Sequence, residues 1–384
     1  MYTIGILLPG STLYPSIGMD LLQGIKSCLK FNDFNEADYQ VNMVSYGLKD
    51  DEIYAAAEKM LILNNADVVI AFIGDYHAAK LSPLFAAAGK LLIISNAGAS
   101  YPENFIAPVT HTIFHSLNDC LCCYLTGKYA ARKEGGHGAI MATSFFDGGY
   151  RHIHAITNGF MLSGGEIKHN FISHYKKEDF NTDTFTAFII DNPGIQNILA
   201  VYSGDMARLF MKKMLDLQKE YSLQLYASPM MFDCTPGDFD EPKPTLPDMC
   251  GYTNWLPELD NDLNRAFMEY YKTVHHKEAN LFSMQGWECG LLIIQYLQER
   301  TNAANTEAAI ELLKAQKINS PRGTVCLNEQ RHTLGPAYLV QTAANRQFTF
   351  AETLDDTSAD FAEMQATVPK DEPYSAWRNT YLCI

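Results

Sequence analysis

The sequence predicts an α/β fold made of two doubly wound, parallel-sheet lobes. Continuous apolar runs such as residues 3–8 (TIGILL) are typical of parallel strands that are buried on both faces. Segments with apolar residues at helical spacing alternate with these runs along the chain. The alternation restarts near residue 115, and a chain of 384 residues is long enough for two domains.

The first unit is predicted to hold four strands and three helices before residue 96. Met19, Leu22, Ile25 and Leu29 recur at the spacing of one helix face, which indicates the first of these helices. The other elements follow from the same alternation. The expected strands are 3–8, 40–46, 67–73 and 91–95, and the expected helices are 19–30, 51–64 and 77–88.

The second unit repeats this rhythm from residue 115 to residue 227. No glycine- or serine-rich linker separates the units, so short crossings rather than a tether are expected to join them. The expected helices are 115–132, 149–163 and 204–219, and the expected strands are 138–143, 167–171, 197–202 and 223–227.

The remainder of the chain has a less regular pattern. Residues 232–260 carry five prolines and many acids, which argues against helix or strand there. Residues 321–341 are expected to form a hairpin, and the segment after them is predicted to be rich in loops. Further helices are expected at 260–274, 284–299 and 306–316.

Charge and hydropathy exclude several kinds of partner. The net charge of −15 makes nucleic acid an unfavourable partner, because phosphate binding needs a basic surface. No run of about 18 apolar residues occurs, so contact with a membrane is expected only through a partner. The opening MYTIGILLPG resembles a first strand and lacks the basic region and cleavage site of a signal peptide. Either the protein is cytoplasmic, or a signal peptide has been removed from it.

The nine cysteines do not settle the redox compartment, because an odd number leaves at least one thiol outside an internal disulfide. Cys234 and Cys250 flank the proline-rich loop and could form a disulfide in an oxidising compartment. Cys120 and Cys123 form a CxxC pattern, but they lie in an apolar helical segment that indicates core packing. Cys28 and Cys122 are expected in the core as well.

No signature of an enzyme or a metal site is found in the sequence. The patterns GxGxxG, GxxxxGK[ST], GxSxG and HExxH are absent. His111 and His115 stand four residues apart, but no third ligand follows at a convincing spacing. The pairs His152 with His154 and His275 with His276 are interpreted as solvated. We therefore expect no catalytic residues, no metal and no cofactor.

Three loops that follow strands of the first unit are rich in small and hydroxyl residues. They read PGSTLYPS, GDYHAA and SNAGAS. In a doubly wound sheet, ligands bind beyond the carboxyl ends of the strands, and small residues let backbone N–H groups approach them. Ser95, Asn96 and Ser100 would add side-chain donors. Ordinary turns and caps use the same residues, so this alternative stays open.

Five segments of the chain, in order, resemble type I periplasmic binding proteins of the branched-chain amino-acid class. They begin IGILLPGSTLYPSIG, IAFIGDYHAAKL, FFDGGYRHIHAITNGF, FMEYYKTVHHKEANLF and INSPRGTVCLNEQRHTLGPAYLVQ. The resemblance covers roughly residues 3–341 and implies two lobes joined by a hinge that the chain crosses several times. The implied lobes are 1–116 with 252–333, and 117–251 with 334–384.

The resemblance also implies ligand contacts in both lobes. In lobe 1, Ser100 matches the family's hydroxyl contact, and His77 is the candidate for a missing serine where Ala78 and Ala79 stand. In lobe 2, Asp205 is the candidate partner for an ammonium or hydroxyl group, because Met230 and Met231 occupy the family's acidic position. The full set of expected contacts is Tyr14, His77, Ser95, Ala97, Gly98, Ser100, Tyr150, Ser203, Asp205 and Trp255.

The expected function is that of a receptor that clamps a small polar or amino-acid-like solute between two lobes. The family's serine and acidic positions are occupied by alanine and methionine here, and these departures favour a polar or aromatic solute over a branched-chain amino acid. The resemblance implies uptake through an ABC permease and a periplasmic or extracellular location. The alternative is a cytoplasmic ligand sensor of the amidase-regulator kind, with the same fold.

Overall fold

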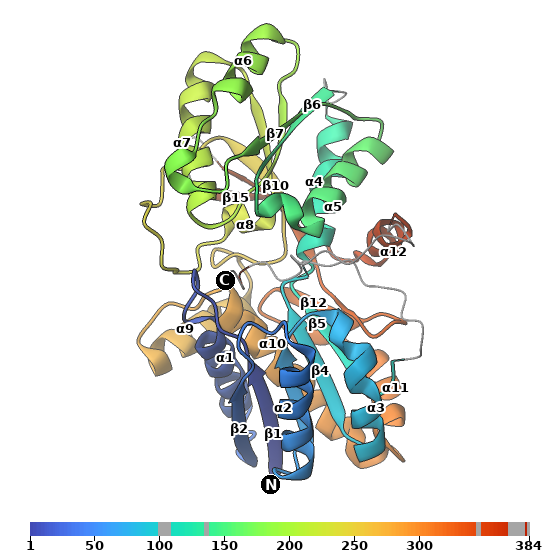
Figure 1. Ribbon diagram of the computed structural model, residues 1–384. Coiled ribbons are helices and arrows are strands. Elements are labelled where there is room, and N and C mark those ends of the chain that lie inside the picture. The colour runs from blue at the N-terminus through green and yellow to red at the C-terminus, as the bar shows by residue number, and fades with distance from the viewer. Residues whose placement is uncertain (99–108, 134–137, 343–346, 368–380, 382–384) are drawn as a thin grey trace.

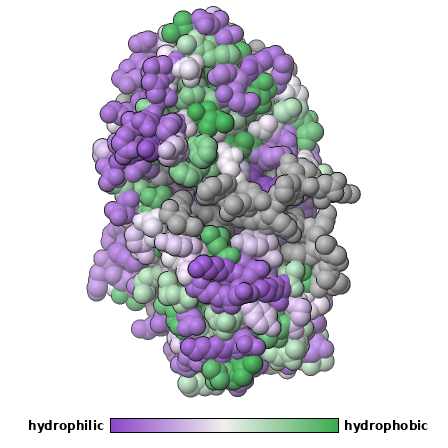
Figure 2. Space-filling view, viewed as in Figure 1, coloured by the Kyte–Doolittle hydropathy of each residue, from purple (hydrophilic) through white to green (hydrophobic). Residues whose placement is uncertain are grey.

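The protein is described by a computed structural model that covers residues 1–98, 109–133, 138–342, 347–367 and 381. It consists of two α/β lobes stacked end to end, with the chain crossing between them (Figure 1). The predicted fold class is confirmed. Hydrophilic side chains cover much of both lobes on the face in Figure 2, and the hydrophobic ones there form small separate patches.

Lobe 1 is built on a five-stranded parallel sheet in the order β2-β1-β3-β4-β5. Every residue of β3 and β4 is buried, as the continuous apolar runs predicted. The order reverses between β1 and β3, which places the switch point of the sheet at the loops that follow these two strands. The strands are β1 Tyr2–Leu8, β2 Ala37–Met43, β3 Val68–Phe72, β4 Leu91–Asn96 and β5 Thr112–Ser116.

The helices of lobe 1 come from two distant parts of the chain. The long α10 packs along α1, although they lie more than 240 residues apart in sequence. A small three-stranded sheet, β11-β12-β13, completes the lobe beside β5. The helices are α1 Ile17–Phe31, α2 Asp50–Ile62, α3 Ala78–Ala88, α9 Asp262–His275, α10 Leu281–Asn302 and α11 Thr306–Lys314, and the small strands are β11 Ile318–Ser320, β12 Gly323–Leu327 and β13 Thr333–Leu334.

Lobe 2 repeats the strand order of lobe 1. Its sheet runs β15-β14-β10-β9-β8-β6-β7, in which β7-β6-β8-β9-β10 correspond to β2-β1-β3-β4-β5. Two strands, β14 and β15, extend this sheet in antiparallel pairing, so the sheet is mixed. The strands are β6 Gly138–Ser144, β7 Glu166–Ser173, β8 Asn197–Val201, β9 Gln224–Ala227, β10 Met249–Thr253, β14 Ala337–Thr342 and β15 Phe348–Leu354.

Six α-helices flank the lobe 2 sheet in the described part of the chain. Among them, α4 packs closely against α5, just as α10 packs against α1 in lobe 1. Short 3₁₀ turns at 75–77, 147–149 and 177–179 connect strands to helices. The helices are α4 Asp119–Arg132, α5 Arg151–Leu162, α6 Asp183–Asp191, α7 Gly204–Glu220, α8 Pro229–Phe232 and α12 Ser358–Ala366.

The chain passes between the two sheets three times, after β5, after β10 and between β13 and β14. Side-chain amides tie these crossings together. Asn254 donates from Nδ2 to the carbonyl oxygen of Leu117, which joins the second crossing to the first. Asn118 donates from Nδ2 to the Thr333 carbonyl oxygen at 3.1 Å, which joins the first crossing to the third. The hinge is therefore a bundle of three linked segments.

Several predicted elements differ from the structure. The helix expected from residue 115 begins at Asp119, because residues 112–116 form β5. The segment 232–260, expected to be irregular, contains β10. Residues 321–341 form parts of three strands in two sheets rather than one hairpin, and the tail contains β15 and α12. These short strands are fixed by pairing with neighbours, which periodicity within one segment cannot reveal.

Candidate functional site

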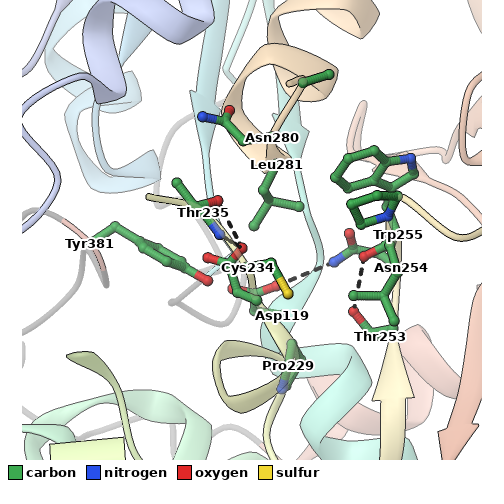
Figure 3. Close-up of a pocket in the computed structure, with 14 residues that line it drawn as sticks. Asp119, Pro229, Cys234, Thr235, Thr253, Asn254, Trp255, Asn280, Leu281 and Tyr381 are labelled. Atoms are coloured by element: carbon green, nitrogen blue, oxygen red, sulfur yellow. Dashed lines mark hydrogen bonds between the residues drawn. The ribbon is translucent and has the colours of Figure 1, made fainter. Parts of the chain in front are cut away.

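A pocket lies between the lobes, beside the second crossing (Figure 3). Its walls come from the start of α4, the α8 loop and the end of β10 in lobe 2, and from the start of α10 in lobe 1. The free volume is only ≈ 30 Å³, which is room for water but not for a solute. The lining residues are Asp119, Pro229, Asp233, Cys234, Thr235, Thr253, Asn254, Trp255, Leu256, Pro257, Ala279, Asn280, Leu281 and Tyr381.

One wall of this pocket presents oxygen atoms with no hydrogen-bond partner among the described residues. They are Oδ2 of Asp119, Oδ2 of Asp233 and Oδ1 of Asn254. Asp119 and Asn254 are 1% and 2% exposed, so their side chains lie away from the bulk solvent. The remaining polar atoms of both residues are used, since Asn254 donates from Nδ2 to Oδ1 of Asp119 at 3.2 Å. Buried acceptors of this kind can accept from a water molecule or from a ligand donor.

Burial raises the pKa of both pocket carboxyl groups, because loss of water disfavours the charged form. For Asp119, the His152 ring opposes this rise in pKa, and its Nε2 lies 4.0 Å from Oδ2. For Asp233, bonds from the Thr235 backbone N–H and hydroxyl oppose the rise in pKa. None of the described residues that line the pocket is a lysine or an arginine, so this wall favours donors and positive charge.

The opposite side of the pocket is aromatic. The ring of Tyr381 lies 4.9 Å from the ring of Tyr14 and 5.0 Å from the ring of Phe282, both edge-to-face. Tyr381 is 1% exposed. Its ring points toward the middle of the pocket (Figure 3). A side chain of the protein itself thus lies in the pocket between the lobes.

A second, adjoining pocket lies on the other side of the Asp233–Thr235 segment, with a free volume of ≈ 50 Å³. It contains the two basic side chains Arg208 and Lys243, together with Tyr14 and Phe239. Lys243 donates to the sulfur of Cys234 at 2.8 Å. All cysteines in the described part of the chain are free, so the disulfide considered between Cys234 and Cys250 is not formed.

Three of the lobe 1 residues expected to contact a ligand, Ser95, Ala97 and Gly98, have partners within the protein. Ser95 is fully buried and accepts from Nε2 of Gln285 at 2.9 Å. The carbonyl oxygens of Ala97 and Gly98 accept from the first backbone N–H groups of α4. Gly98 has φ +78°, and a Cβ there would crowd the backbone of Asn118, so glycine is required. Ala97 and Gly98 thus anchor the first crossing, Ser95 anchors α10, and none of the three lines the pocket.

His77 ends the 3₁₀ turn that follows β3 and is not among the residues that line the two pockets. Its Nδ1 lies 2.6 Å from a carboxylate oxygen of Asp50, and its Nε2 lies 3.1 Å from the carbonyl oxygen of Gly47. His77 therefore fixes the start of α2 against the loop after β3. Ser100 falls outside the described residues.

The lobe 2 candidates are also engaged. Ser203 donates from its backbone N–H and its hydroxyl to Asp147, at 3.0 and 2.6 Å. Tyr150 precedes α5 and places its ring edge-on to that of His152, with centroids 6.0 Å apart. Neither residue lines the pocket between the lobes. Both lie at the carboxyl ends of strands, where the sequence placed them.

Asp205 holds a lobe 2 loop that touches lobe 1. It accepts from the backbone N–H groups of Glu241 at 3.0 Å and Asp240 at 3.3 Å. In the same loop, the Asp238 N–H donates to the Leu13 carbonyl oxygen at 2.8 Å, and the Phe239 ring lies 5.3 Å from that of Tyr14. Asp205 therefore acts on the inter-lobe contact through this loop.

Two of the predicted residues line the pockets themselves. Trp255 is in the main pocket, where its Nε1 donates to Oδ1 of Asn264 at 2.8 Å. Tyr14 is in the adjoining one. Sequence reasoning missed Asp119, Asp233, Asn254 and Tyr381. A usable signal existed for Asp119 and Asn254, since each is a polar residue at a crossing of the hinge.

The structure corrects the expectation that His152 is solvated. His152 is 0% exposed, so it is a core residue and not a solvated one. His115 is also fully buried, and His111 and His115 lie at β5 instead of on one helix face. Within the described ranges, no three His, Cys, Asp or Glu side chains are grouped so as to hold a metal ion.

The two lobes, the linked hinge and the pocket between them define a hinged binding protein. The family model described as periplasmic binding protein matches residues 1–347. The chain therefore belongs to the periplasmic binding protein family, a class of solute-binding receptors. No described helix has the length and apolar character that crossing a membrane requires. No curated protein matches the chain.

Solved structures share this fold at low sequence identity. An ABC transporter substrate-binding protein from Sphaerobacter thermophilus has a TM-score of 0.75 and 16% identity, over 92% of this chain and 98% of that one. A solute-binding protein of Rhodopseudomonas palustris BisB5, in complex with 3,4-dihydroxybenzoic acid, has a TM-score of 0.69 and 16% identity, over 92% and 97%. An ABC-type branched-chain amino acid transporter protein of Rhodopseudomonas palustris CGA009 has a TM-score of 0.70 and 14% identity, over 99% and 100%.

Proposed function

We propose that this protein is a receptor that holds a small polar, amino-acid-like or aromatic solute between its two lobes and delivers it to an ABC permease. The observation that carries the proposal is the pocket between the lobes, where three buried oxygens lack partners among the described residues. Membership of the periplasmic binding protein family supports it. The solved relatives also favour a transport receptor over a cytoplasmic sensor.

The proposed mechanism is capture followed by closure about the hinge. The proposed lobes are residues 1–116 with 252–333, and residues 117–251 with 334–384. The boundary at 251/252 moves to Thr253, because β10 ends there and belongs to the lobe 2 sheet. Rotation about the three linked crossings would open the pocket without breaking either sheet. Closure would then exclude water and strengthen each hydrogen bond to the ligand. No bond of the solute is made or broken, and no cofactor takes part.

The proposed contacts are the pocket groups with spare bonding capacity. Asp119, Asp233 and Asn254 accept from the ligand, while Trp255 and Tyr14 supply apolar surface. Other residues of the expected set support the pocket without lining it, because they hold the neighbouring loops and helices in place. They are Ser95, Ala97, Gly98, Ser203 and Asp205. Such a pocket, mostly apolar with a few oriented polar groups, is typical of small-molecule sites. The proposed location is the periplasm or the outside of the cell.

The experiment is a calorimetric titration of the full chain with a panel of amino acids, aromatic acids and aromatic amines. For the solute that binds, Asp119→Asn and Asp233→Asn should each weaken binding by about 1.5–3 kcal/mol, because a charged acceptor is lost. This corresponds to a Kd about tenfold to a hundredfold higher. The control is Asp216→Asn, which removes an exposed carboxylate paired with Lys219.

Unchanged affinity in both pocket variants would reject these contacts. Absence of binding for every solute in a broad panel, together with no co-purified small molecule in native mass spectrometry, would reject the receptor function.

A further inference from the structure

We infer that the side chain of Tyr381 stands in the place of the ligand, and that the ligand is an aromatic compound bearing an amine. This inference rests on the proposed receptor function and names both the ligand class and an internal competitor for the site. When the solute binds, its ring takes the position of the Tyr381 ring, and Tyr381 leaves the pocket.

The first evidence is the environment of the ring. Tyr14 and Phe282 enclose the Tyr381 ring edge-to-face, and Phe239 continues the aromatic wall behind Tyr14. Tyr14 and Phe282 belong to lobe 1, and Phe239 belongs to lobe 2. The Tyr381 ring thus contacts two lobe 1 rings directly and the lobe 2 ring of Phe239 only through Tyr14. A planar ring in this position lies where a ligand that closes the hinge is expected. In this structure the tail of the chain supplies that ring.

The second evidence is how Tyr381 is held. Its backbone carbonyl oxygen accepts from the hydroxyl of Ser11 at 2.5 Å, and its φ is +70°, a conformation that residues other than glycine seldom adopt. Its phenol hydroxyl faces Asp233 without a hydrogen bond of standard geometry. Burial, with the negative charges of Asp233 and Asp119, raises the pKa of this phenol. The edge-to-face ring contacts and the hydrogen bond from Ser11 therefore keep Tyr381 in place, and its phenol oxygen adds no hydrogen bond of standard geometry.

The third evidence concerns the class of the ligand. Past the Tyr381 ring, the pocket offers the unpartnered oxygens of Asp119, Asp233 and Asn254. An ammonium group would supply three donors and a positive charge to these atoms. A carboxylate in the same place would meet two acidic side chains and no lysine or arginine among the described lining residues. The pocket thus favours an aromatic amine over an aromatic acid.

The experiment compares benzylamine with benzoate, which share a ring and differ in the charge of the group attached to it. Calorimetry on the full chain should give tighter binding of benzylamine. Removal of the competing ring in Tyr381→Ala should tighten benzylamine binding at least about tenfold, because the open pocket no longer has to be vacated. Tyr381→Phe keeps the ring and should stay within about threefold of the unsubstituted protein.

A second readout uses the unsubstituted protein. Nitration of Tyr381 by tetranitromethane, followed by peptide mass spectrometry, should be slow without ligand and faster with saturating benzylamine. A purely structural role for Tyr381 predicts no change or further protection. This readout also decides the matter if Tyr381→Ala fails to fold, as judged by circular dichroism.

Equal affinity in the unsubstituted protein and Tyr381→Ala, with unchanged nitration, would overturn the competitor role and leave the receptor function intact. Tighter binding of benzoate than of benzylamine would overturn the ligand class. Failure of the whole solute panel to bind any of the three proteins would instead reject the receptor function from which this inference starts.

Discussion

At the scale of single residues, polar side chains at the strand ends serve mainly to join neighbouring loops. In lobe 2, Asp147 accepts from Ser144, at 2.6 Å, and from both donors of Ser203. In lobe 1, Asn96 has the comparable role, since it donates to Asp75 at 2.7 Å and accepts from the Gly98 N–H at 2.8 Å. Residue type and position in the chain predicted polar groups at these edges, but not that they bind one another.

Asp147→Asn should lower the free energy of unfolding by about 2–3 kcal/mol, because hydroxyl and backbone donors are aimed at a charged acceptor. Burial raises the pKa of Asp147, and the bonds from Ser144 and Ser203 oppose that rise. Urea unfolding followed by circular dichroism measures the effect. Asp191→Asn, at the exposed end of α6, is the control and should change stability by less than about 0.5 kcal/mol. A midpoint equal to that of the control would refute the role given to Asp147.

At the scale of elements, two pairs of helices pack so closely that glycine is required at their contact. A Cβ on Gly24 of α1 would overlap the carbonyl oxygen of Ser283 in α10, and one on Gly286 of α10 would overlap that of Leu21. The same reciprocal contact occurs in lobe 2, where Gly127 of α4 lies against the backbone of Ile156 and Gly159 of α5 lies against that of Tyr124. The helices were predictable from apolar spacing, whereas their partners were not, because each pair joins different segments of the chain.

Gly127→Ala should destabilise lobe 2 by about 1–3 kcal/mol or more, since the added methyl group forces α4 and α5 apart. The matched control is Gly194→Ala, where an added Cβ meets nothing within 4 Å and should be nearly neutral. Thermal unfolding of both variants by scanning calorimetry gives the comparison. Equal melting temperatures for the two would show that this helix contact tolerates a wider spacing.

At the scale of the whole molecule, a buried charged cluster fixes the hinge. Arg322 is 0% exposed and donates from Nε to Glu288 at 2.8 Å and from Nη2 to the Ser116 carbonyl oxygen at 3.1 Å. His115 Nε2 lies 3.3 Å from the other carboxylate oxygen of Glu288. Family-like segments in the sequence predicted the two lobes and the hinge. They did not predict this cluster, because its members come from β5, α10 and the turn after β11.

The buried histidines should make the protein less stable in mild acid. Burial lowers the pKa of His115 to about 4 and that of His332 to about 3, against about 6.5 in an unfolded chain. Between these values the unfolded chain binds the protons first, so stability falls as the pH drops below about 6.5. Each histidine contributes a loss of up to about 1.4 kcal/mol per pH unit in that window.

Urea unfolding at pH 7 and pH 5 measures this loss. His332→Gln should reduce the difference between the two pH values, whereas His174→Gln, at an exposed position, should not. Equal pH dependence in the unsubstituted protein and His332→Gln would contradict the assignment.

The three crossings between the lobes also determine when the protein can fold during its synthesis. The face of α1 that α10 covers, and the edge of β5 beside β13, stay bare until the ribosome has passed residue 334. Translation of the intervening stretch takes roughly 10 to 40 seconds at about 5–20 residues per second. For that period the first 116 residues expose apolar surface that only the late segments bury. We therefore expect the first third of the nascent chain to be a main site of chaperone binding.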